Sequence, residues 1–340
     1  MSRMFKTFSD YRKAWTDAYQ KDPSVPLNID IELASLCNLA CPFCFWGETD
    51  FNKEMQKHAD DGKPKKRLMP TAMALKIIDE AAAMGVPALK FNWRGESTIH
   101  PDYSTILKYA SLKEVGGEND KEEDGCYRPA FHELLVNTNG NCKDHAIEGL
   151  MAATKVMISL DSCVPETYAK MRVNGQLSNA IAVGKELIRR GHPNLWFRRV
   201  ITKANQEEPF KRQVDVIFGG AGYQVSEHYC VDRSDDSKHE STANPAAYER
   251  TYCGYPSQRM MIGSDGSVYP CCVDYDGTMP MGKWTGEAGG TLADLWMNAK
   301  FQELRGELRC GTFKSEACKN CTSWMAYKAP QKENVQDKAL

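Results

Sequence analysis

The sequence lacks a long apolar run, a strong excess of charge of one sign and an internal repeat. No apolar stretch approaches the length that crosses a bilayer, and the first residues, MSRMFKTFSDYRKAW, contain no signal-type apolar segment. The formal net charge of -2 gives no broad positive field of the kind that attracts nucleic acid. We therefore expect a cytoplasmic protein without a membrane span, and we do not expect nucleic acid as a partner.

Cysteine, by contrast, is abundant. The 340 residues include 13 cysteines, and this odd number argues against a complete set of intramolecular disulfides. In a reducing compartment, clustered cysteines indicate metal sites instead. The proportions of hydrophobic residues, 42%, and charged residues, 26%, are those of a globular chain that can bury one large core or two unequal ones.

Short strand patterns alternate with helical patterns through the first two thirds of the chain. In PLNIDIEL, apolar residues occupy every second position, and PTAMALKIIDEAAAM has helical spacing and stops at Gly85, a residue type that commonly caps helices. This alternation predicts an α/β fold, a parallel sheet with crossover helices in a partial (β/α)6 TIM-like barrel, with the chemistry at the C-terminal ends of the strands. The predicted strands span residues 26–33, 88–93, 132–137, 155–160, 195–201 and 223–229.

The composition divides the chain into five predicted segments. The first carries aromatic residues at spacings of three and four and is expected to form a helix that packs against the main body. A polar linker, DRSDDSKHESTANP, ends the core, and the residues after it hold six of the 13 cysteines, which indicates a smaller α+β domain. The predicted segments are the N-terminal helix at 1–24, the core at 25–231, the linker at 232–248, the second domain at 249–330 and a flexible tail at 331–340.

The stretch CNLACPFC at residues 37–44 places three cysteines directly after the first predicted strand. Three such thiolates can bind zinc, form part of an iron–sulfur site, or bind nothing. A structural zinc site needs four ligands, and the residues between these cysteines offer none. A cubane iron–sulfur cluster held by Cys37, Cys41 and Cys44 would leave one iron open to an external ligand, which accounts for the missing fourth cysteine.

This C-x3-C-x2-C pattern, with an aromatic residue before the last cysteine, resembles the signature of the radical S-adenosylmethionine (SAM) superfamily. The resemblance implies that the three cysteines hold a [4Fe-4S] cluster whose open iron is chelated by the amino and carboxylate groups of SAM. It also implies an electron donor such as flavodoxin or ferredoxin, because one-electron reduction cleaves SAM to a 5′-deoxyadenosyl radical.

Further stretches at strand ends resemble the SAM-binding motifs of the superfamily. WRGES at residues 93–97 is similar to a Gly-Gly-Glu-Pro motif, from which it departs at its arginine and last serine. Its glycine lets the backbone approach the ligand, and its glutamate can accept a bond from the SAM ammonium. Phe43 is expected beside the adenine ring, with packing inside the cysteine loop as the alternative. The SAM-binding residues that the resemblance implies are Phe43, Gly95, Glu96, Asn137, Asn139, Ser159 and Arg172.

A second set of cysteines lies in the C-terminal part. Their spacing, with IGSDGSVYPCC in the middle and the pair CKNC at the end, resembles the auxiliary-cluster domains of the SPASM and twitch type. No cysteine follows Cys321, so the pattern resembles the shorter twitch form, with one auxiliary [4Fe-4S] cluster. Cys272 and Cys310 are alternative ligands, and a structural zinc is the alternative metal. The ligands that the resemblance implies are Cys253, Cys271, Cys318 and Cys321.

Full ligation of the auxiliary cluster would leave no iron for the substrate and favours electron transfer. We therefore expect hydrogen abstraction and a two-electron oxidation of a small polyol, sugar or nucleotide-like substrate, with the auxiliary cluster accepting an electron. Twitch-type relatives include alcohol dehydrogenases that act on aminocyclitols, while SPASM relatives modify peptides and sulfatases. About 26 residues precede the first strand, which we expect to be too few for a domain that recognises a leader peptide.

Other functions fit parts of the same pattern. A redox-neutral isomerase or epimerase, or a modifier of a peptide or nucleic acid, would use the auxiliary cluster differently, and a zinc-stabilised binding module would have no catalysis.

For an oxidation, a residue must hold or deprotonate the substrate. Arg198 and Arg199 are neighbours on one predicted strand, so one should face inward and the other outward. The candidates for this role are Arg198, Arg199, Tyr255 and Asp274.

Overall fold

The computed structural model describes most of the core and of the C-terminal part. The predicted linker at 232–248 and the predicted tail at 331–340 lie outside the described residues. No helix in the described part is long and apolar enough to cross a membrane. The described residues are 4–18, 20–44, 68–115, 128–230, 250, 252–319, 321 and 323.

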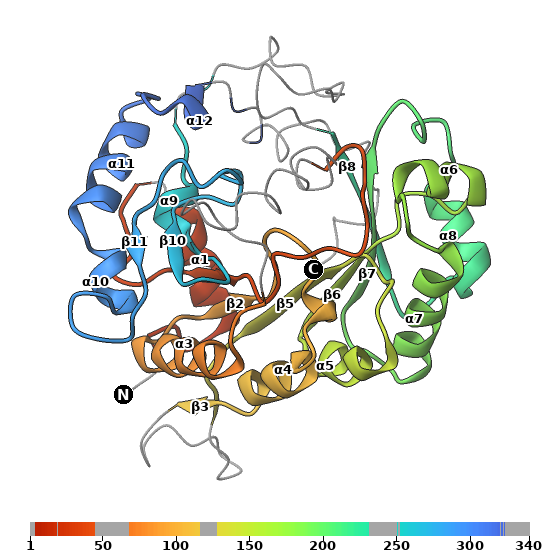
Figure 1. Ribbon diagram of the computed structural model, residues 1–340, viewed down its shortest axis with the longest axis horizontal. Helices are drawn as coiled ribbons and strands as arrows, with labels where there is room; N and C mark the ends of the chain where they lie inside the picture. Colours follow the sequence, from red (N-terminus) through yellow and green to blue (C-terminus); the bar gives the residue numbers. More distant parts are fainter. Residues whose placement is uncertain are drawn as a thin grey trace, which may run out of the picture.

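A curved nine-stranded sheet forms the centre of the molecule, in the order β11-β10-β9-β1-β2-β5-β6-β7-β8 (Figure 1). Its six strands from β1 to β8 pair in parallel, which confirms the predicted α/β fold with a partial barrel. A separate two-stranded sheet joins β3 (Glu114–Val115) to β4 (Arg128–Pro129). The parallel strands are β1 (Asn28–Ile31), β2 (Ala88–Lys90), β5 (Glu133–Thr138), β6 (Lys155–Ser159), β7 (Leu195–Ile201) and β8 (Gln224–Tyr229).

Crossover helices connect the parallel strands and follow the outer side of the curved sheet (Figure 1). The first of them, α3, ends at Gly85 as predicted, because this glycine adopts a φ of 77° and its amide bonds the carbonyls of Ala81 and Ala82. The elements of this layer are α3 (Thr71–Met84), η2 (Ser97–Ile99), α4 (Tyr103–Ser111), η4 (Asp144–Ala146), α5 (Ile147–Ala152), α6 (Pro165–Met171), α7 (Leu177–Arg189) and α8 (Phe210–Phe218).

The C-terminal part continues the core sheet. Strand β9 (Arg259–Ile262) pairs in parallel with β1, and β10 (Ser267–Tyr269) returns antiparallel to β9. The C-terminal cysteines are therefore attached directly to the edge of the barrel on which the first cysteine loop begins. The other elements of this part are α9 (Tyr255–Gln258), β11 (Gly282–Lys283), α10 (Leu292–Trp296), α11 (Ala299–Arg309) and α12 (Glu316–Lys319).

The N-terminal segment forms the helix α1 (Phe8–Asp17), which begins with a capping box between Thr7 and Asp10. It packs against the main body, since Tyr11 is buried. The segment also contacts the C-terminal part, where Gln258 Nε2 donates to the carbonyl of Trp15 at 2.9 Å. These contacts join the N-terminal helix to the C-terminal part.

Alternation along β1 separates the core from the interior of the barrel. Ile29 and Ile31 are fully buried in one hydrophobic cluster with Ile77 of α3. Burial of each such side chain contributes about 1.5–3 kcal/mol. Asp30 and Glu32 alternate with these residues and are buried on the opposite face, where a charge needs a partner. On this face Asp30 pairs with Lys90, and Glu32 pairs with Arg94.

Candidate functional site

The first cysteine loop leaves the C-terminal end of β1. Cys41 is buried, while Cys37 and Cys44 are exposed. The amide of Cys44 donates to the carbonyl of Cys41 at 3.0 Å, and the amide of Ala40 donates to the carbonyl of Val173 at 2.9 Å. The loop is thus anchored to the segment that follows α6.

The glycine of WRGES lies directly against this loop. Gly95 has a φ of 68°, and a Cβ added to it would lie 2.4 Å from the carbonyl oxygens of Ala34 and Leu36. The amide of Glu96 donates to the carbonyl of Leu36 at 2.7 Å. Only glycine permits this close approach to the segment that enters the cysteine loop, and the predicted approach of its backbone to SAM stays a prediction.

Glu96 joins the ends of two strands. Its Oε1 accepts from the hydroxyls of Thr98 at 2.7 Å and Thr138 at 2.9 Å, and its Oε2 accepts from the amide of Asn139 at 2.7 Å. Burial raises the pKa of this carboxyl, while the same hydrogen bonds oppose that change. These contacts make Glu96 a positioning residue, and its predicted bond to the SAM ammonium stays a prediction.

An amide network holds the cysteine loop to the turn after β5. Asn139 Nδ2 donates to Asn38 Oδ1 at 2.8 Å, and Asn38 Nδ2 donates to the carbonyl of Asn141 at 2.8 Å. Asn137, by contrast, lies on β5, where its amide donates to Asn92. The sequence predicted Asn139 and Asn137 but missed Asn38, whose one signal is its place directly after Cys37.

Arg172 brings three parts of the site together. Its guanidinium donates to Cys41 Sγ at 3.5 Å, lies 5.4 Å from the ring centre of Phe43, and pairs with Asp161 at 2.5 Å. Asp161 was missed from the sequence; it follows β6 with a φ of 62°, and its Oδ1 accepts from the amide of Val200. Two of the predicted SAM-binding residues, Phe43 and Arg172, are therefore in contact beside a predicted cluster ligand.

The two arginines of β7 face opposite sides, as predicted. Arg199 is buried, pairs with Glu227 with an Nε–Oε2 distance of 2.9 Å, and lies 5.2 Å from the ring centre of Phe210 in α8. It therefore belongs to the outer, helix-covered face, and we do not carry it further as a candidate for holding the substrate.

Arg198 lies on the interior face. The strand register places it between Ser159 of β6 and Ser226 of β8. Burial and the nearby Arg198 lower the pKa of His228 on β8 to about 4, so this imidazole is neutral at neutral pH. Ser159, a predicted SAM-binding residue, thus shares this row with Arg198.

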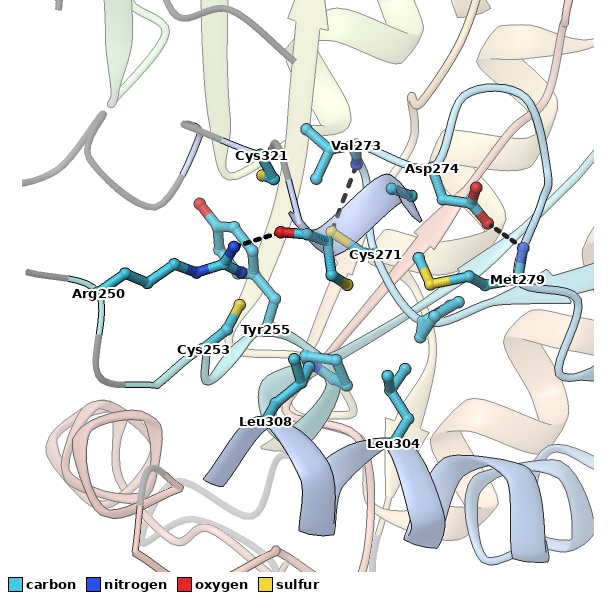
Figure 2. Close-up of a pocket in the computed structure, with 14 residues that line it drawn as sticks. Arg250, Cys253, Tyr255, Cys271, Val273, Asp274, Met279, Leu304, Leu308 and Cys321 are labelled. Atoms are coloured by element: carbon cyan, nitrogen blue, oxygen red, sulfur yellow. Dashed lines mark hydrogen bonds between the residues drawn. The ribbon is translucent and has the colours of Figure 1, made fainter. Parts of the chain in front are cut away.

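Four of the C-terminal cysteines line one pocket (Figure 2). Burial raises the pKa of the Cys318 thiol to about 12, and the nearby Cys253 thiol raises it too. Buried thiolates need a positive partner, which an iron–sulfur cluster supplies. Within the described part of the chain, no three His, Cys, Asp or Glu side chains already lie close enough to hold a metal ion. The fit of a cluster therefore rests on the pocket that the four cysteines line together. Its four cysteines are Cys253, Cys271, Cys318 and Cys321.

The pocket lining distinguishes between the cysteines that are alternative ligands of the auxiliary cluster. Cys271 lines it, whereas Cys272 packs against the aromatic group of Trp93 and Tyr269. Cys310 is exposed at the end of α11 and is not a lining residue. The geometry therefore favours Cys271 as the ligand.

Tyr255 and Asp274 also line this pocket. The carboxylate of Asp274 accepts from the amide and hydroxyl of Thr278 at 2.8 Å and from the amide of Met279 at 2.9 Å. These contacts give Asp274 a role in holding its own loop. Tyr255 remains the candidate base from this side.

Replacement of either neighbouring cysteine tests the choice of ligand. We expect Cys271→Ala to lose the iron of the auxiliary cluster, about four per chain, because the pocket would keep only three of its four thiolates. Cys272→Ala is the matched control and should keep its iron. Iron and sulfide analysis after anaerobic reconstitution measures both variants, and iron loss only in Cys272→Ala would reverse the assignment.

The comparison with family models decides the family. The model of the radical SAM superfamily matches residues 31–215, more than half of the chain. The chain belongs to the radical SAM superfamily. A model of the SPASM iron-sulfur cluster-binding domain matches residues 253–322, which contain the four-cysteine pocket. These matches confirm the predicted family and its cofactors, a [4Fe-4S] cluster with SAM and auxiliary iron–sulfur binding.

Curated relatives match parts of the chain. The mycofactocin maturase MftC of Mycobacterium tuberculosis is 25% identical over 192 residues, which are 56% of this chain and 41% of that protein. The S-adenosyl-L-methionine-dependent 2-deoxy-scyllo-inosamine dehydrogenase of Niallia circulans is 38% identical over 72 residues, 21% of this chain and 28% of the dehydrogenase. The chain therefore aligns with less than half the length of either relative.

Solved structures share the fold over most of the chain. BtrN in complex with AdoMet and 2-DOIA aligns with a TM-score of 0.55 and 17% identity, over 89% of this chain and 94% of BtrN. Streptococcus suis SuiB bound to S-adenosylmethionine aligns with a TM-score of 0.58 and 15% identity, over 92% of this chain and 83% of SuiB. Both have the arrangement of barrel and C-terminal domain found here.

Proposed function

We propose that this radical SAM enzyme is a dehydrogenase, which oxidises a small polyol, sugar or nucleotide-like substrate by two electrons. The observation that carries this proposal is the pocket lined by four cysteines, since four thiolates would occupy all four irons of one cluster and leave none for the substrate. Such a cluster is suited to accept an electron. The stretch that is 38% identical to a SAM-dependent dehydrogenase supports the same reaction class.

The residues of the chain then have distinct roles. Cys37, Cys41 and Cys44 would hold the SAM-binding cluster, with Gly95 beside their loop and Arg172 against Cys41. When bound, SAM and the clusters supply a hydrogen-abstracting radical and an acceptor for one electron. The barrel must exclude water, because the radical would otherwise be quenched. The oxidation also releases a proton, and Tyr255, which lines the auxiliary pocket, is our candidate for its acceptor.

Arg198 is the residue that we expect to hold the substrate, since it lies on the interior face in register with Ser159. Arg198→Lys keeps the charge but loses the planar fork, so we expect product formation to fall by about 100-fold. Uncoupled SAM cleavage should persist, because the cluster ligands are unchanged. Arg189→Lys, on the exposed face of α7, is the control and should behave as the wild type. A wild-type rate of oxidation in Arg198→Lys would remove Arg198 from the site.

The stoichiometry of the reaction tests the proposed function itself. The reconstituted enzyme, with SAM and reduced flavodoxin or dithionite, should form one 5′-deoxyadenosine for each oxidised product, starting with 2-deoxy-scyllo-inosamine and related aminocyclitols. An isomerase would instead form product without net oxidation.

Peptide modification is the second candidate, because SuiB, which shares the fold with a TM-score of 0.53, has been solved with a bound precursor peptide. If the enzyme oxidises a small polyol in this assay, the result supports the dehydrogenase. Product formation only from a peptide substrate would replace it.

A further inference from the structure

Residues 93–96, which follow β2, lie between the two cysteine sites; we refer to them as the bridge segment. On one side, the amide of Glu96 donates to the carbonyl of Leu36 at 2.7 Å, and Gly95 packs against the same carbonyl. Leu36 directly precedes Cys37 in the chain. This half of the bridge segment therefore fixes the start of the first cysteine loop.

The other half of the bridge segment reaches the auxiliary site. Trp93 Nε1 donates to the carbonyl of Cys272 at 2.9 Å, and Arg94 Nη1 donates to the carbonyl of Tyr275 at 3.2 Å. Cys272 follows Cys271, and Asp274, which precedes Tyr275, lines the four-cysteine pocket. The bridge segment thus contacts the loop of each cysteine site through adjacent residues.

A buried ion pair makes this connection stiff. Arg94 pairs with Glu32 through two bonds, Nε to Oε1 at 2.7 Å and Nη2 to Oε2 at 3.0 Å, and both side chains are almost fully buried. Glu32 also accepts from the amide of Ser264, between β9 and β10, at 2.9 Å. The guanidinium lies 4.1 Å from the ring centre of Trp93. A paired, two-point contact of this kind fixes geometry as well as charge.

We propose that Arg94 and Trp93 are positioning residues that hold the SAM site and the auxiliary site in a fixed relation to each other. Arg94 occupies the place where the related Gly-Gly-Glu-Pro motif has a glycine, so this connection goes beyond the contacts that the motif implies. The proposal rests on the cysteine ligands assigned under the proposed function, but it is independent of the substrate and of the net reaction.

Two conservative variants test the proposal in the full-length, anaerobically reconstituted enzyme. Arg94→Lys keeps the positive charge and loses the two-point contact with Glu32, while Trp93→Phe keeps a ring and loses the indole N–H. Each is expected to weaken SAM binding by about tenfold and also to change the midpoint potential and electron paramagnetic resonance signal of the auxiliary cluster. Both readouts are made without substrate, and Trp93→Phe provides a second test if Arg94→Lys fails to fold.

Two further variants separate a shared effect from a local one. Thr98→Val removes a hydroxyl that donates to Glu96 and should weaken SAM binding alone. Arg305→Lys alters a buried arginine that lies 3.8 Å from the ring centre of Trp296 and donates to the carbonyl of Pro256, which lines the auxiliary pocket. It should change the auxiliary signal alone.

The proposal is supported if both bridge variants change SAM binding and the auxiliary-cluster signal, while each control variant changes only one of the two. A change at only one site, or at neither, in Arg94→Lys and Trp93→Phe overturns it. A wild-type enzyme that assembles no second cluster would refute the assigned ligands and the proposal together. Failure to oxidise any polyol, with these site effects intact, would refute only the proposed dehydrogenase activity.

Discussion

Replacement of Cys37, Cys41 and Cys44 by Ala in one variant is expected to abolish SAM cleavage and to leave about half of the iron. The three thiols belong to one loop after β1, and Arg172 donates to the sulfur of Cys41. The other four cysteines lie in a separate pocket and should still assemble their cluster. The wild type should contain about eight irons per chain and the variant roughly four.

Iron and sulfide counts, together with 5′-deoxyadenosine formed from SAM and dithionite without oxygen, measure both effects. A variant with Cys163, Cys230 and Cys310 replaced by Ala is the control, because none of these cysteines lines the pocket or belongs to the first loop. It should keep eight irons and full cleavage. Zinc in place of iron, or cleavage that survives loss of the first three cysteines, would contradict the ligand assignment.

Local sequence patterns were sufficient for most elements of the barrel. The β7 strand was predicted at its observed bounds, 195–201, and α3 ends at the predicted Gly85. Both depend on neighbouring residues: alternation of side chains in a strand and the left-handed conformation of a capping glycine. The parallel pairing of β9 with β1, by contrast, joins residues more than 200 positions apart. No periodicity in either strand specifies that partner, so the C-terminal part was predicted only as a separate domain.

The cysteine spacing was equally informative about the site, because ligands of one cluster on one loop must be close in sequence. The residues that orient this loop could not be predicted in this way, because they come from other segments of the chain. Asn38 contacts the turn after β5, Asp161 contacts Val200 of β7, and Arg94 reaches Glu32 only when β1 and β2 are paired. Strand alternation predicted that Arg198 and Arg199 face opposite sides. Which one faces outward is seen only in the contacts of Arg199 with Glu227 of β8 and Phe210 of α8.

Gly95→Ala is expected to have the second large effect. The added Cβ would lie 2.4 Å from two carbonyl oxygens of the segment that enters the first cysteine loop, and those backbone atoms cannot move without shifting Cys37. The φ of 68° adds strain of about 1–2 kcal/mol for a residue with a side chain. Because a displacement of about 1 Å can cost a hundredfold in rate, we expect SAM cleavage to fall by at least about that factor.

Gly191→Ala is the control that separates the effect of backbone strain at a positive φ from the effect of displacing the cysteine loop. Gly191 follows α7 with a φ of 72°, close to that of Gly95, but an added Cβ there would meet no atom within 4 Å. This control should lose about 1–2 kcal/mol of stability from strain alone and keep its SAM cleavage. Thermal unfolding and 5′-deoxyadenosine formation compare the two variants. Equal cleavage by both would mean that the Gly95 contact does not position the cysteine loop, whereas loss confined to Gly95→Ala would show that the loop tolerates no shift of its backbone.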